Sequence, residues 1–475
     1  MDSREKYSKI RIEHWTKVAR LSDRQSTWGN SYHKRLVKFL RFIIPEGQKV
    51  IEIGCGKGSL LAALKPSPGV GIDFCPAMIS AAQKKYSGLK FIRADAHDIQ
   101  LDEKFDYIIL SDLVNDLWDV QKVLEQMARL SHPNTRLIIS FYSRLWSPIL
   151  SFASFLKLSK PALQQNWLTS ADVENILELA GFETFHSWKE ILFPFPIPIL
   201  EPFCNKYLAK IWPFYHLTLT NILMARPISR AQIKPGKPLV SVIVPARNEA
   251  GNIQPIFKRI PEMGKGTEIV FVEGHSKDRT YETILKNQRL FPERRSHLFR
   301  QTGKGKGDAV RLGFEKAKGD ILMILDADLT VPPEDLSLFY RALVENKAEF
   351  INGVRLVYPM EKDAMRFFNF LGNKFFSLAF SWLLGQPIKD TLCGTKVLWK
   401  SDYERIAANR KYFGDFDPFG DFDLLFGAAK LGLRIIDLPI RYRERVYGST
   451  NIERWKHGWL LLRMVAFAAA RIKFV

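Results

Sequence analysis

Residues 50–64 read VIEIGCGKGSLLAAL, and this stretch decides the fold of the first half of the chain. Four strand-forming residues lead directly into Gly54, Gly56 and Gly58, and a helix-forming run follows. This order predicts a short buried strand, a tight loop and a helix. Glycine is needed in such a loop because a Cβ would keep the chain from passing close beneath a bound ligand, while the helix N-terminus offers free amides. A glycine-rich loop alone is a weak signal, so its surroundings must support it.

The sequence that follows repeats the alternation of strand and helix. Further apolar strands are expected at residues 69–72, 89–92 and 105–114, and such alternation builds a parallel α/β sheet. The second strand leads into Asp73, where a carboxylate can accept hydrogen bonds from both ribose hydroxyls of an adenosine cofactor. The third strand is followed by Asp95, which is placed to meet the adenine amino group.

Four segments together resemble the class I S-adenosylmethionine-dependent methyltransferases over residues 30–226: EIGCGKG, GIDFCPAMI, RADAHDI and FDYIILSDLV. The resemblance implies a Rossmann-like sheet that binds S-adenosylmethionine. It assigns Glu52, Gly54, Gly56 and Gly58 to the methionine moiety. It assigns Asp73 to the ribose and Asp95 to the adenine. An NAD-type unit is the alternative, but its glycine pattern is GxGxxG, whereas this chain has GxGxG.

The methyl acceptor is not evident from these motifs. Methyl transfer from a sulfonium is a displacement that needs alignment and at most one base. Asp112, Asn115 and Asp116 follow the fourth strand on the side where an acceptor should enter, and His132 is a candidate base. Each of them is more often a cap or loop residue, and no NPPY-type motif for amino-group methylation occurs in the sequence.

A linker divides the chain. Around RPISRAQIKPGKP the periodicity vanishes, and Pro, Gly and Lys become frequent. We therefore expect a methyltransferase domain with a helical lead-in at residues 1–226, a linker at 227–238 and a second α/β domain at 239–475. The 475-residue length suits two domains.

Acidic residues follow three strands of the second domain. Strands are expected at 240–244, 268–272 and 321–325, and the last of them leads into Asp326-Ala327-Asp328. The carboxyl ends of parallel strands are where an open α/β sheet binds a nucleotide. Two carboxylates one residue apart can hold Mg²⁺ or Mn²⁺ while a diphosphate fills other positions. Such an ion stabilises the charge that develops when a sugar–diphosphate bond breaks.

The order of motifs in the second domain is more specific than any one of them. LVSVIVPARNE, KGKGDAV, the acidic triplet, DTLCGTK, FGDFD and RYRERVYGST follow one another over residues 238–455. This set closely resembles family 2 glycosyltransferases of the GT-A fold, and among them the dolichyl- or polyprenyl-phosphate mannose and glucose synthases. The fold class expected for the whole chain is therefore α/β with two domains, a Rossmann-like methyltransferase sheet followed by a GT-A sheet.

The resemblance also implies roles for individual residues. It assigns Pro245, Arg247, Glu249 and Glu273 to the nucleotide base and ribose. It assigns Lys306 and Asp308 to the nucleotide and sugar, and Asp326 and Asp328 to the metal and diphosphate. It gives the role of the acceptor-side acid to Asp421 or Asp423. It assigns Arg441, Arg443 and Ser449 to binding of the acceptor phosphate. The common Asp-Asp-Gly-Ser segment is Glu-Gly-His-Ser in this chain, which leaves the nucleobase open. The transmembrane tail of some relatives is also missing.

The net charge of +20 favours an anionic partner. A phosphate acceptor, anionic at neutral pH, needs arginines rather than a strong base, whereas a sugar hydroxyl needs Asp421 or Asp423 to take its proton. Apolar stretches at 191–225 and 458–475 are able to lie in a membrane interface, although core packing is the alternative. Nucleic acid is not expected, because no RNA-binding signature of aromatic and basic residues occurs.

The distribution of cysteine and apolar residues bears on location. Four separated cysteines without CxxC spacing favour a reducing cytoplasm, and we expect no signal peptide and no membrane-spanning run. The leading hypothesis is thus a cytoplasmic, bifunctional transferase at the inner face of a membrane. It uses a nucleotide-sugar donor, a lipid-phosphate or glycan acceptor, S-adenosylmethionine, and Mg²⁺ or Mn²⁺. The alternatives are a hydroxyl-directed glycosyltransferase and a methyltransferase domain that serves only as a binding or scaffold module.

Overall fold

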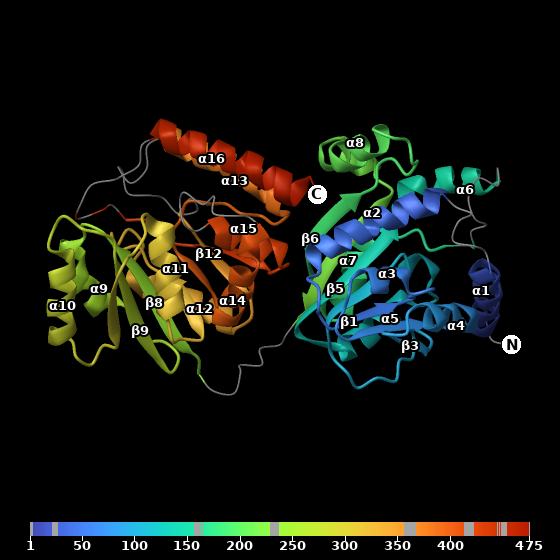
Figure 1. The fold of residues 1–475 in the computed structure, drawn as a ribbon, viewed down its shortest axis with the longest axis horizontal. Helices are drawn as coiled ribbons and strands as arrows, with labels where there is room; N and C mark the ends of the chain where they lie inside the picture. Colours follow the sequence, from blue (N-terminus) through green and yellow to red (C-terminus); the bar gives the residue numbers. More distant parts are fainter. Residues whose placement is uncertain are drawn as a thin grey trace. The chain divides into compact units, whose positions relative to one another are not determined.

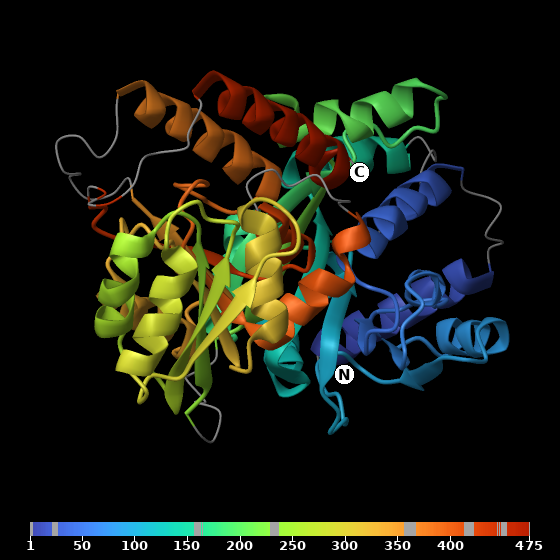
Figure 2. The same ribbon diagram turned by 60° about the vertical axis from the view of Figure 1, so that its left-hand side comes forward.

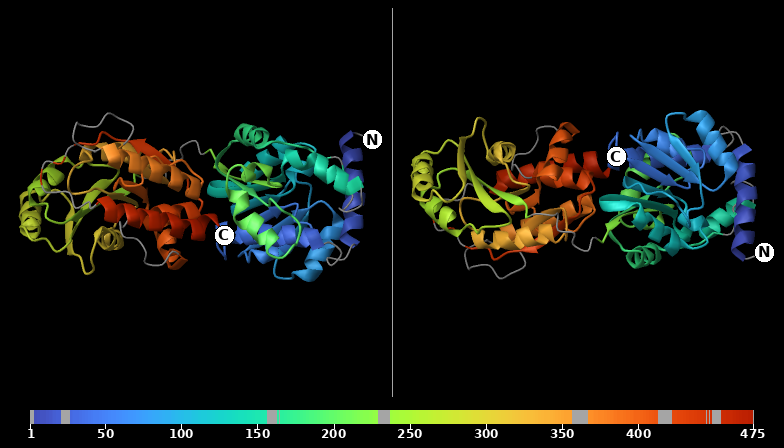
Figure 3. Two further views of the ribbon diagram at one scale, coloured as in Figure 1. Left: turned by 90° about the horizontal axis from the view of Figure 1, so that it is seen from above. Right: turned by 90° about the horizontal axis from the view of Figure 1, so that it is seen from below.

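A computed structural model of the protein describes residues 3–20, 27–155, 163, 165–228, 237–355, 367–412, 422–443, 445, 447 and 454–474. The chain divides into two compact units, Met1–Ser229 with Phe474–Val475, and Arg230–Lys473. Each unit holds one seven-stranded sheet with helices on both faces (Figures 1, 2 and 3). The expected two-domain α/β class is confirmed.

The sheet of the first unit has the order β3-β2-β1-β4-β5-β7-β6. Its strands are β1 (Val50–Ile53), β2 (Gly69–Asp73), β3 (Lys90–Arg93), β4 (Phe105–Ser111), β5 (Ser131–Tyr142), β6 (Phe182–Glu190) and β7 (Thr220–Pro227). The first five strands run parallel, and β7 lies antiparallel between β5 and β6. The carboxyl ends of β1, β2, β4, β5 and β6 therefore meet at one edge.

Helices cover both faces of this sheet. They are α1 (Ser3–Arg20), α2 (Thr27–Ile43), α3 (Ser59–Ala63), α4 (Pro76–Lys85), α5 (Val120–Arg129), α6 (Ser147–Phe155), α7 (Ser170–Leu179) and α8 (Leu200–Lys206). Strand side chains alternate between two cores: one face packs against α2, α3 and α4, and the other against α5 and α7. The helical lead-in expected before Pro45 contains α1 and α2, and α1 packs against α4.

The sheet of the second unit has the order β10-β9-β8-β11-β13-β12-β14. Its strands are β8 (Leu239–Ala246), β9 (Gly266–Glu273), β10 (Ser296–Arg300), β11 (Ile321–Ile324), β12 (Phe350–Val354), β13 (Lys396–Trp399) and β14 (Ile435–Pro439). Strands β10, β9, β8 and β11 are parallel, whereas β13 is antiparallel to both β11 and β12. The acid-bearing ends of β8, β9 and β11 consequently lie side by side.

Two helical layers enclose this second sheet. One layer holds α9 (Ile253–Arg259), α10 (Thr280–Leu290) and α12 (Leu336–Val344), which share a core with alternate residues of β8. The other layer holds α11 (Lys306–Lys316), α13 (Phe367–Leu384), α14 (Lys400–Ala408), α15 (Phe422–Lys430) and α16 (Arg454–Ala468). Helices α13 and α16 lie side by side (Figure 1). Within the described residues, no helix is both long and apolar enough to cross a bilayer.

Candidate active sites

The glycine loop after β1 has the backbone that its sequence predicts. Gly54, Gly56 and Gly58 all adopt positive φ, at 75°, 51° and 73°, a region where other residues are strained. A Cβ on Gly54 would come within 2.9 Å of Leu113, and one on Gly58 within 2.6 Å of the Phe91 ring. A Cβ on Gly56 would meet no protein atom within 4 Å. The surface above Gly56 is therefore open to a ligand.

Two buried carboxylates fix this loop. Asp73, 8% exposed, accepts hydrogen bonds from the backbone amides of Gly56 at 2.9 Å and Cys75 at 2.8 Å. Glu52, 2% exposed, accepts from the Leu61 amide at 3.1 Å. Burial raises the pKa of Asp73, and it raises the pKa of Glu52 to about 8. The structure brings both of these predicted residues to the loop, where backbone donors hold them in place.

Asp95 is the centre of a network. It accepts from the His97 amide at 2.9 Å and faces His97 Nδ1 at 2.6 Å, and Arg4 of α1 lies 3.1 Å away. The Asp119 amide donates to His97 Nε2 at 3.1 Å. Because Nε2 accepts, Nδ1 carries the proton and donates to Asp95. Hydrogen bonds from His97 hold the pKa of Asp95 below its usual range.

Helix α1 contributes contacts that sequence reasoning did not identify. Arg11, 5% exposed, donates from Nε to the Asp116 carboxylate at 2.8 Å, and the Trp15 indole donates to the other oxygen at 2.9 Å. Tyr7 lies under the Arg11 guanidinium and donates to the Asp116 carbonyl. Asp116 thus ties α1 to the loop after β4. The partners of Asp116 lie about 100 residues away in the sequence. The only sequence signal for these contacts is a Trp and an Arg within an otherwise polar helix.

Asp112 lies in a polar cluster at the carboxyl edge. It accepts from the Tyr32 hydroxyl at 2.8 Å and from Ser140 Oγ at 2.9 Å, and its own φ is 55°. Burial raises the pKa of both Asp112 and Tyr32. The Thr220 hydroxyl, at the start of β7, reaches Tyr32 at 3.4 Å. Among the residues expected on the acceptor side, Asp112 is therefore the one that lies among hydroxyl groups at this edge.

Asn115 and His132 have structural partners. Asn115 is fully buried, donates to the Asn166 carbonyl at 2.7 Å and accepts from the Tyr142 amide at 3.2 Å. His132 lies at the amino end of β5 and contacts Asp106, at the amino end of β4, at 3.1 Å. Since the glycine loop is at the carboxyl edge and His132 is at the amino edge, the interpretation of His132 as a base was wrong.

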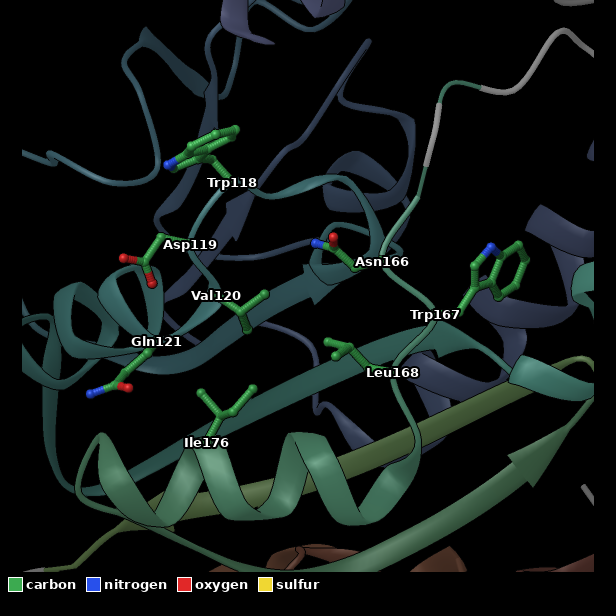
Figure 4. A pocket seen from close by; sticks show the side chains of 8 residues that line it. All are labelled: Trp118, Asp119, Val120, Gln121, Asn166, Trp167, Leu168 and Ile176. Atoms are coloured by element: carbon green, nitrogen blue, oxygen red, sulfur yellow. The ribbon is translucent and has the colours of Figure 1, made fainter. Parts of the chain in front are cut away.

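A shallow cavity of about 700 Å³ flanks the loop after β4 (Figure 4). It lies between the N-terminal part of α5 and the segment that precedes α7. The lining residues are Trp118, Asp119, Val120, Gln121, Asn166, Trp167, Leu168 and Ile176. The Asn166 side chain donates to the carbonyl oxygens of Val114 and Leu117 at 3.3 and 2.7 Å. This segment therefore supports the loop that carries Asp116.

In the second unit, Glu249 and Glu273 lie at the ends of β8 and β9. Glu273, 5% exposed, accepts from the Ser276 amide at 2.5 Å. Glu249, 7% exposed, accepts from Asn252 Nδ2 at 2.7 Å, and burial raises its pKa to about 7. Of the other predicted nucleotide residues, Pro245 is half-buried and Arg247 is exposed on the same loop. The structure thus brings all four predicted residues to one edge.

Asp326 and Asp328 each have a cationic partner. Lys306 Nζ lies 2.6 Å from Asp326, and Arg445 Nη2 lies 2.5 Å from Asp328. Burial favours the neutral form of Asp326, but Lys306 outweighs it and the pKa is lowered. Thr330 donates from its hydroxyl and its amide to the second oxygen of Asp328, at 2.8 and 3.1 Å. The acidic triplet is therefore charge-balanced by side chains from distant segments.

Arg445 was not singled out from the sequence, although it stands in RYRERVYGST. Its guanidinium contacts Asp328 and also lies 3.6 Å from Glu249. The neighbouring Tyr447 packs on Gly251, where a Cβ would come within 2.6 Å of the ring. This segment therefore reaches the loop after β8 as well as the end of β11. Charge alone did not indicate which arginine of the motif would point inward.

Further cations and a glycine surround the triplet. Lys396, fully buried, donates to the Cys393 carbonyl, and the charges of Lys396 and Arg355 contribute to the lowered pKa of Asp326. Arg355 forms a bidentate pair with the fully buried Asp390 at 2.7 and 2.9 Å. A Cβ on Gly394 would meet the Asp326 carboxylate and Lys306 Nζ at 2.2 Å. The DTLCGTK motif thus forms a wall of the site.

The remaining predicted residues differ in how they are held. Asp308, in the first turn of α11, accepts from the Gly303 amide at 3.0 Å and so ties the preceding turn to this helix. Asp423, 7% exposed, lies 3.1 Å from Arg410 and 3.2 Å from Arg311. Arg441 and Arg443 are exposed. The predicted Asp421 and Ser449 lie outside the described residues.

The two carboxylates of the triplet are compatible with a metal ion that phosphate oxygens of the substrate also hold. In the parts of the chain that the structure describes, no group of three His, Cys, Asp or Glu side chains could hold a metal by itself. Two carboxylates plus phosphate oxygens and water are, however, the usual set for Mg²⁺. Asp326 and Asp328 fit that set, provided that Lys306 and Arg445 exchange partners.

Comparison with known proteins agrees with this division. The methyltransferase-domain family model matches residues 44–181, and that of glycosyl transferase family 2 matches residues 241–406. Dolichol-phosphate mannosyltransferase of Pyrococcus furiosus is 30% identical over 248 residues, which are 50% of this chain and 67% of that protein. The undecaprenyl-phosphate 4-deoxy-4-formamido-L-arabinose transferase of Edwardsiella ictaluri is 25% identical over 216 residues, 45% of this chain and 62% of that protein.

A solved structure is also similar to part of the chain. The magnesium protoporphyrin IX methyltransferase of Synechocystis, with bound S-adenosylhomocysteine, is 18% identical. The alignment covers 47% of this chain and 97% of that one, with a TM-score of 0.32.

The fold and the two sites define a two-unit transferase. A Rossmann-like unit with a glycine loop after its first strand precedes a GT-A unit with an acidic triplet at a strand end. More specifically, the chain belongs to glycosyl transferase family 2 through its second unit and carries a methyltransferase domain in its first.

Proposed function

We propose that the second unit transfers a sugar from a nucleotide sugar to a polyprenyl phosphate, with inversion at the anomeric carbon. The observation that carries this proposal is the acidic triplet enclosed by cations, Lys306 beside Asp326 and Arg445 beside Asp328. A diphosphate is a ligand that needs several positive groups together with an anchored metal ion. The similarity to dolichol- and undecaprenyl-phosphate sugar transferases supports the lipid-phosphate acceptor.

The nucleotide would lie along the ends of β8 and β9. Pro245, Arg247, Glu249 and Glu273 would contact its base and ribose, and Lys306 and Asp308 would contact the phosphate and sugar. Both glutamates are held by hydrogen bonds from their own loops, which leaves other lone pairs to accept from ribose hydroxyls or a base N–H.

Asp326 and Asp328 would hold Mg²⁺ or Mn²⁺ in this site. Such an ion neutralises charge on the departing diphosphate. Each carboxylate would have to exchange its present cation for the metal ion, and Lys306 and Arg445 would then be available to the diphosphate oxygens. The site is thus charge-balanced with and without donor.

The acceptor chemistry follows from charge. A lipid phosphate is largely anionic at neutral pH and attacks without a base, so Arg441, Arg443 and Ser449 would serve to hold it. A second candidate reaction, transfer to a sugar hydroxyl, needs a carboxylate base. Asp423 is paired with two arginines, which suits it to position α15 against α11, and Asp421 would then be the base.

Transfer assays separate these reactions. Purified protein would be given the radiolabelled nucleotide sugar that stabilises it, with either polyprenyl phosphate or a panel of free saccharides. We expect label in the lipid phase, which Asp421→Asn reduces little. Label only in saccharide products, with loss in Asp421→Asn, would replace the lipid phosphate by a hydroxyl acceptor.

For the first unit, we propose binding of S-adenosylmethionine and methyl transfer. The open surface above Gly56 and the buried Asp73 beside it support the cofactor position. Glu52, Gly54 and Gly58 would complete the methionine side and Asp95 the adenine side. The scaffold-module alternative predicts no binding, so calorimetry with S-adenosylmethionine on the intact chain decides between the two.

We further propose peripheral association with the inner face of a membrane. In the second unit, Leu378 of α13 is 72% exposed and Trp459 of α16 is 64% exposed. Large apolar side chains exposed on adjacent helices are typical of an interfacial surface. Co-sedimentation with anionic vesicles tests this association.

A further inference from the structure

The first unit exposes a large apolar surface at the carboxyl edge of its sheet. We call this surface the apolar edge and define it by six residues. They are, with their exposed fractions, Ile199 (85%), Trp212 (73%), Phe152 (63%), Leu145 (61%), Leu217 (53%) and Phe203 (51%). Large apolar side chains exposed together on neighbouring segments are typical of an interaction site.

The apolar edge is formed by two segments that are joined to each other. One segment is α6 and the short helix before it, and the other is the connection between β6 and β7, which contains α8. The Trp146 indole donates to the Leu217 carbonyl at 2.8 Å, and the Ser143 amide donates to the Leu219 carbonyl at 2.7 Å. Figure 1 shows α6 and α8 beyond the same edge of the sheet.

Buried polar contacts anchor the second segment from beneath. Lys210 pairs with Glu190 at the end of β6, and both side chains are less than 10% exposed. Arg35 of α2 donates to the Asn205 carbonyl at 3.2 Å, and the Asn205 side chain exchanges hydrogen bonds with Phe193 at 2.8 Å in both directions. Asn205 of α8 therefore faces inward, whereas Leu200 and Phe203 of the same helix are exposed.

This surface shares its edge with the methyltransferase site. Strands β5 and β6 end in it, and both run in the same direction as β1 and β4, whose ends carry the glycine loop and Asp112. The connection that forms the apolar edge continues into Thr220, whose hydroxyl reaches Tyr32 and so the Asp112 cluster. A partner bound here would lie next to the acceptor side of the site.

The charges around the apolar edge select the kind of partner. Lys38 of α2 is exposed, and its pKa is lowered by burial and by the charges of Arg35 and Lys206, against the opposing charge of Glu201. Arg144 is exposed beside Leu145. Exposed tryptophan, phenylalanine and aliphatic side chains with a basic rim match the interface of an anionic bilayer.

We propose that the apolar edge docks the methyltransferase unit on an anionic lipid bilayer, so that its methyl acceptor reaches the site from the membrane. The inference rests on the peripheral association proposed above and adds a surface of the first unit to it. The acceptor is accordingly a membrane-borne molecule rather than a freely diffusing one.

Environment-sensitive probes on the full-length protein test the docking. A nitrobenzoxadiazole label would be placed at Ile199→Cys or Trp212→Cys, with exposed Asn134→Cys at the amino end of β5 as the matched control. The native cysteines are all buried and compete little for the label. With vesicles of phosphatidylglycerol and phosphatidylcholine, we expect a blue shift and quenching by lipid-borne quenchers at 199 and 212 only. Calorimetry with S-adenosylmethionine would verify that each labelled variant keeps its site.

Charge reversal provides an independent arm. Replacing Lys38 and Lys206 by Glu should weaken vesicle binding by about fivefold or more per residue, because each basic group near an anionic surface contributes about that factor. Lys104→Glu, at the amino end of β4, is the control and should change little.

The outcomes separate the two proposals. Vesicle binding with probes at 199 and 212 that stay in water would overturn the apolar edge as a docking surface but keep the peripheral association. Failure of the whole chain to co-sediment would refute the association itself. A blue shift without vesicles that grows with protein concentration would assign the surface to a second copy of the chain instead.

Discussion

The two candidate sites of this chain hold their carboxylates in opposite ways. In the first unit, Asp73 and Glu52 accept hydrogen bonds from backbone amides. In the second, Asp326 and Asp328 are paired with the side chains of Lys306 and Arg445. The first arrangement is fixed by the fold of one loop, and the second depends on side chains that can change partners.

This difference suits the ligands proposed for each site. Ribose is neutral, so a carboxylate that is already oriented by amides can receive its hydroxyls without any rearrangement. A metal-bound diphosphate brings both positive and negative charge. Cations that balance the acids before the donor arrives can then move to the diphosphate, which keeps the buried site close to neutral.

The largest effect is expected at the acidic triplet. Asp326→Asn should lower kcat of sugar transfer by about 100-fold or more, because loss of one charge-stabilising group at a leaving group typically costs that much. Steady-state kinetics with each metal measures this effect, and Asp320→Asn, at an exposed strand start, is the control. Full activity in Asp326→Asn would remove the triplet from the mechanism.

The cofactor loop gives the next effect. Asp73→Ala leaves the amides of Gly56 and Cys75 without their acceptor and removes the partner proposed for two ribose hydroxyls. Hydrogen bonds to a charged group contribute about 1.5–3 kcal/mol each, so the Kd for S-adenosylmethionine should rise about 100-fold. Isothermal calorimetry measures it, with Asp102→Ala as a surface control. An unchanged Kd would refute the assigned ribose site.

Arg445 tests whether the second site really exchanges partners. Arg445→Ala removes the cation beside Asp328 and Glu249, so Mn²⁺ alone should bind more tightly. Nucleotide sugar with Mn²⁺ should bind about 30-fold more weakly, because a lost charge-assisted contact costs about 2 kcal/mol. Thermal shift titrations with each ligand would show the opposite signs. Arg441→Ala, exposed in the same segment, should leave Mn²⁺ affinity unchanged. Changes of the same sign for both ligands would contradict the exchange.

Sequence reasoning predicted strands and strand-end residues, which depend on local patterns, and missed contacts between segments that are far apart in the sequence. The strands at 50–53, 69–72 and 321–325 were predicted within one residue at each end, because short apolar runs between turn signals are a local pattern. Asp326 and Asp328 were placed correctly at a strand end for the same reason. Their partners were not, since Arg445 reaches Asp328 from 117 residues away.

The same distinction explains the errors in the first unit. His132 and Asp112 both stood close to strands, but the direction of the parallel strands puts them at opposite edges of the sheet. The contacts of Arg11 and Trp15 with Asp116 depend on how α1 returns to the loop after β4. A polar helix gives no periodic signal for such a return, so the tertiary structure was needed to find it.

The smallest effect concerns pH at Glu249. Burial raises the pKa of this carboxyl to about 7 from its ordinary 4.5, so it becomes protonated as the pH falls through 7. The proposed contact with ribose or base needs the ionised form as acceptor. Donor affinity should therefore be present above pH 7 and fall by up to about tenfold per unit below it. Glu249→Gln, which cannot titrate, should bind the donor more weakly at pH 8 and show a flatter profile between pH 6 and 8. Calorimetry in buffers of matched ionic strength measures how donor affinity changes with pH in the two proteins. An equal pH dependence in both would show that Glu249 does not contact the donor and that the pH dependence arises elsewhere.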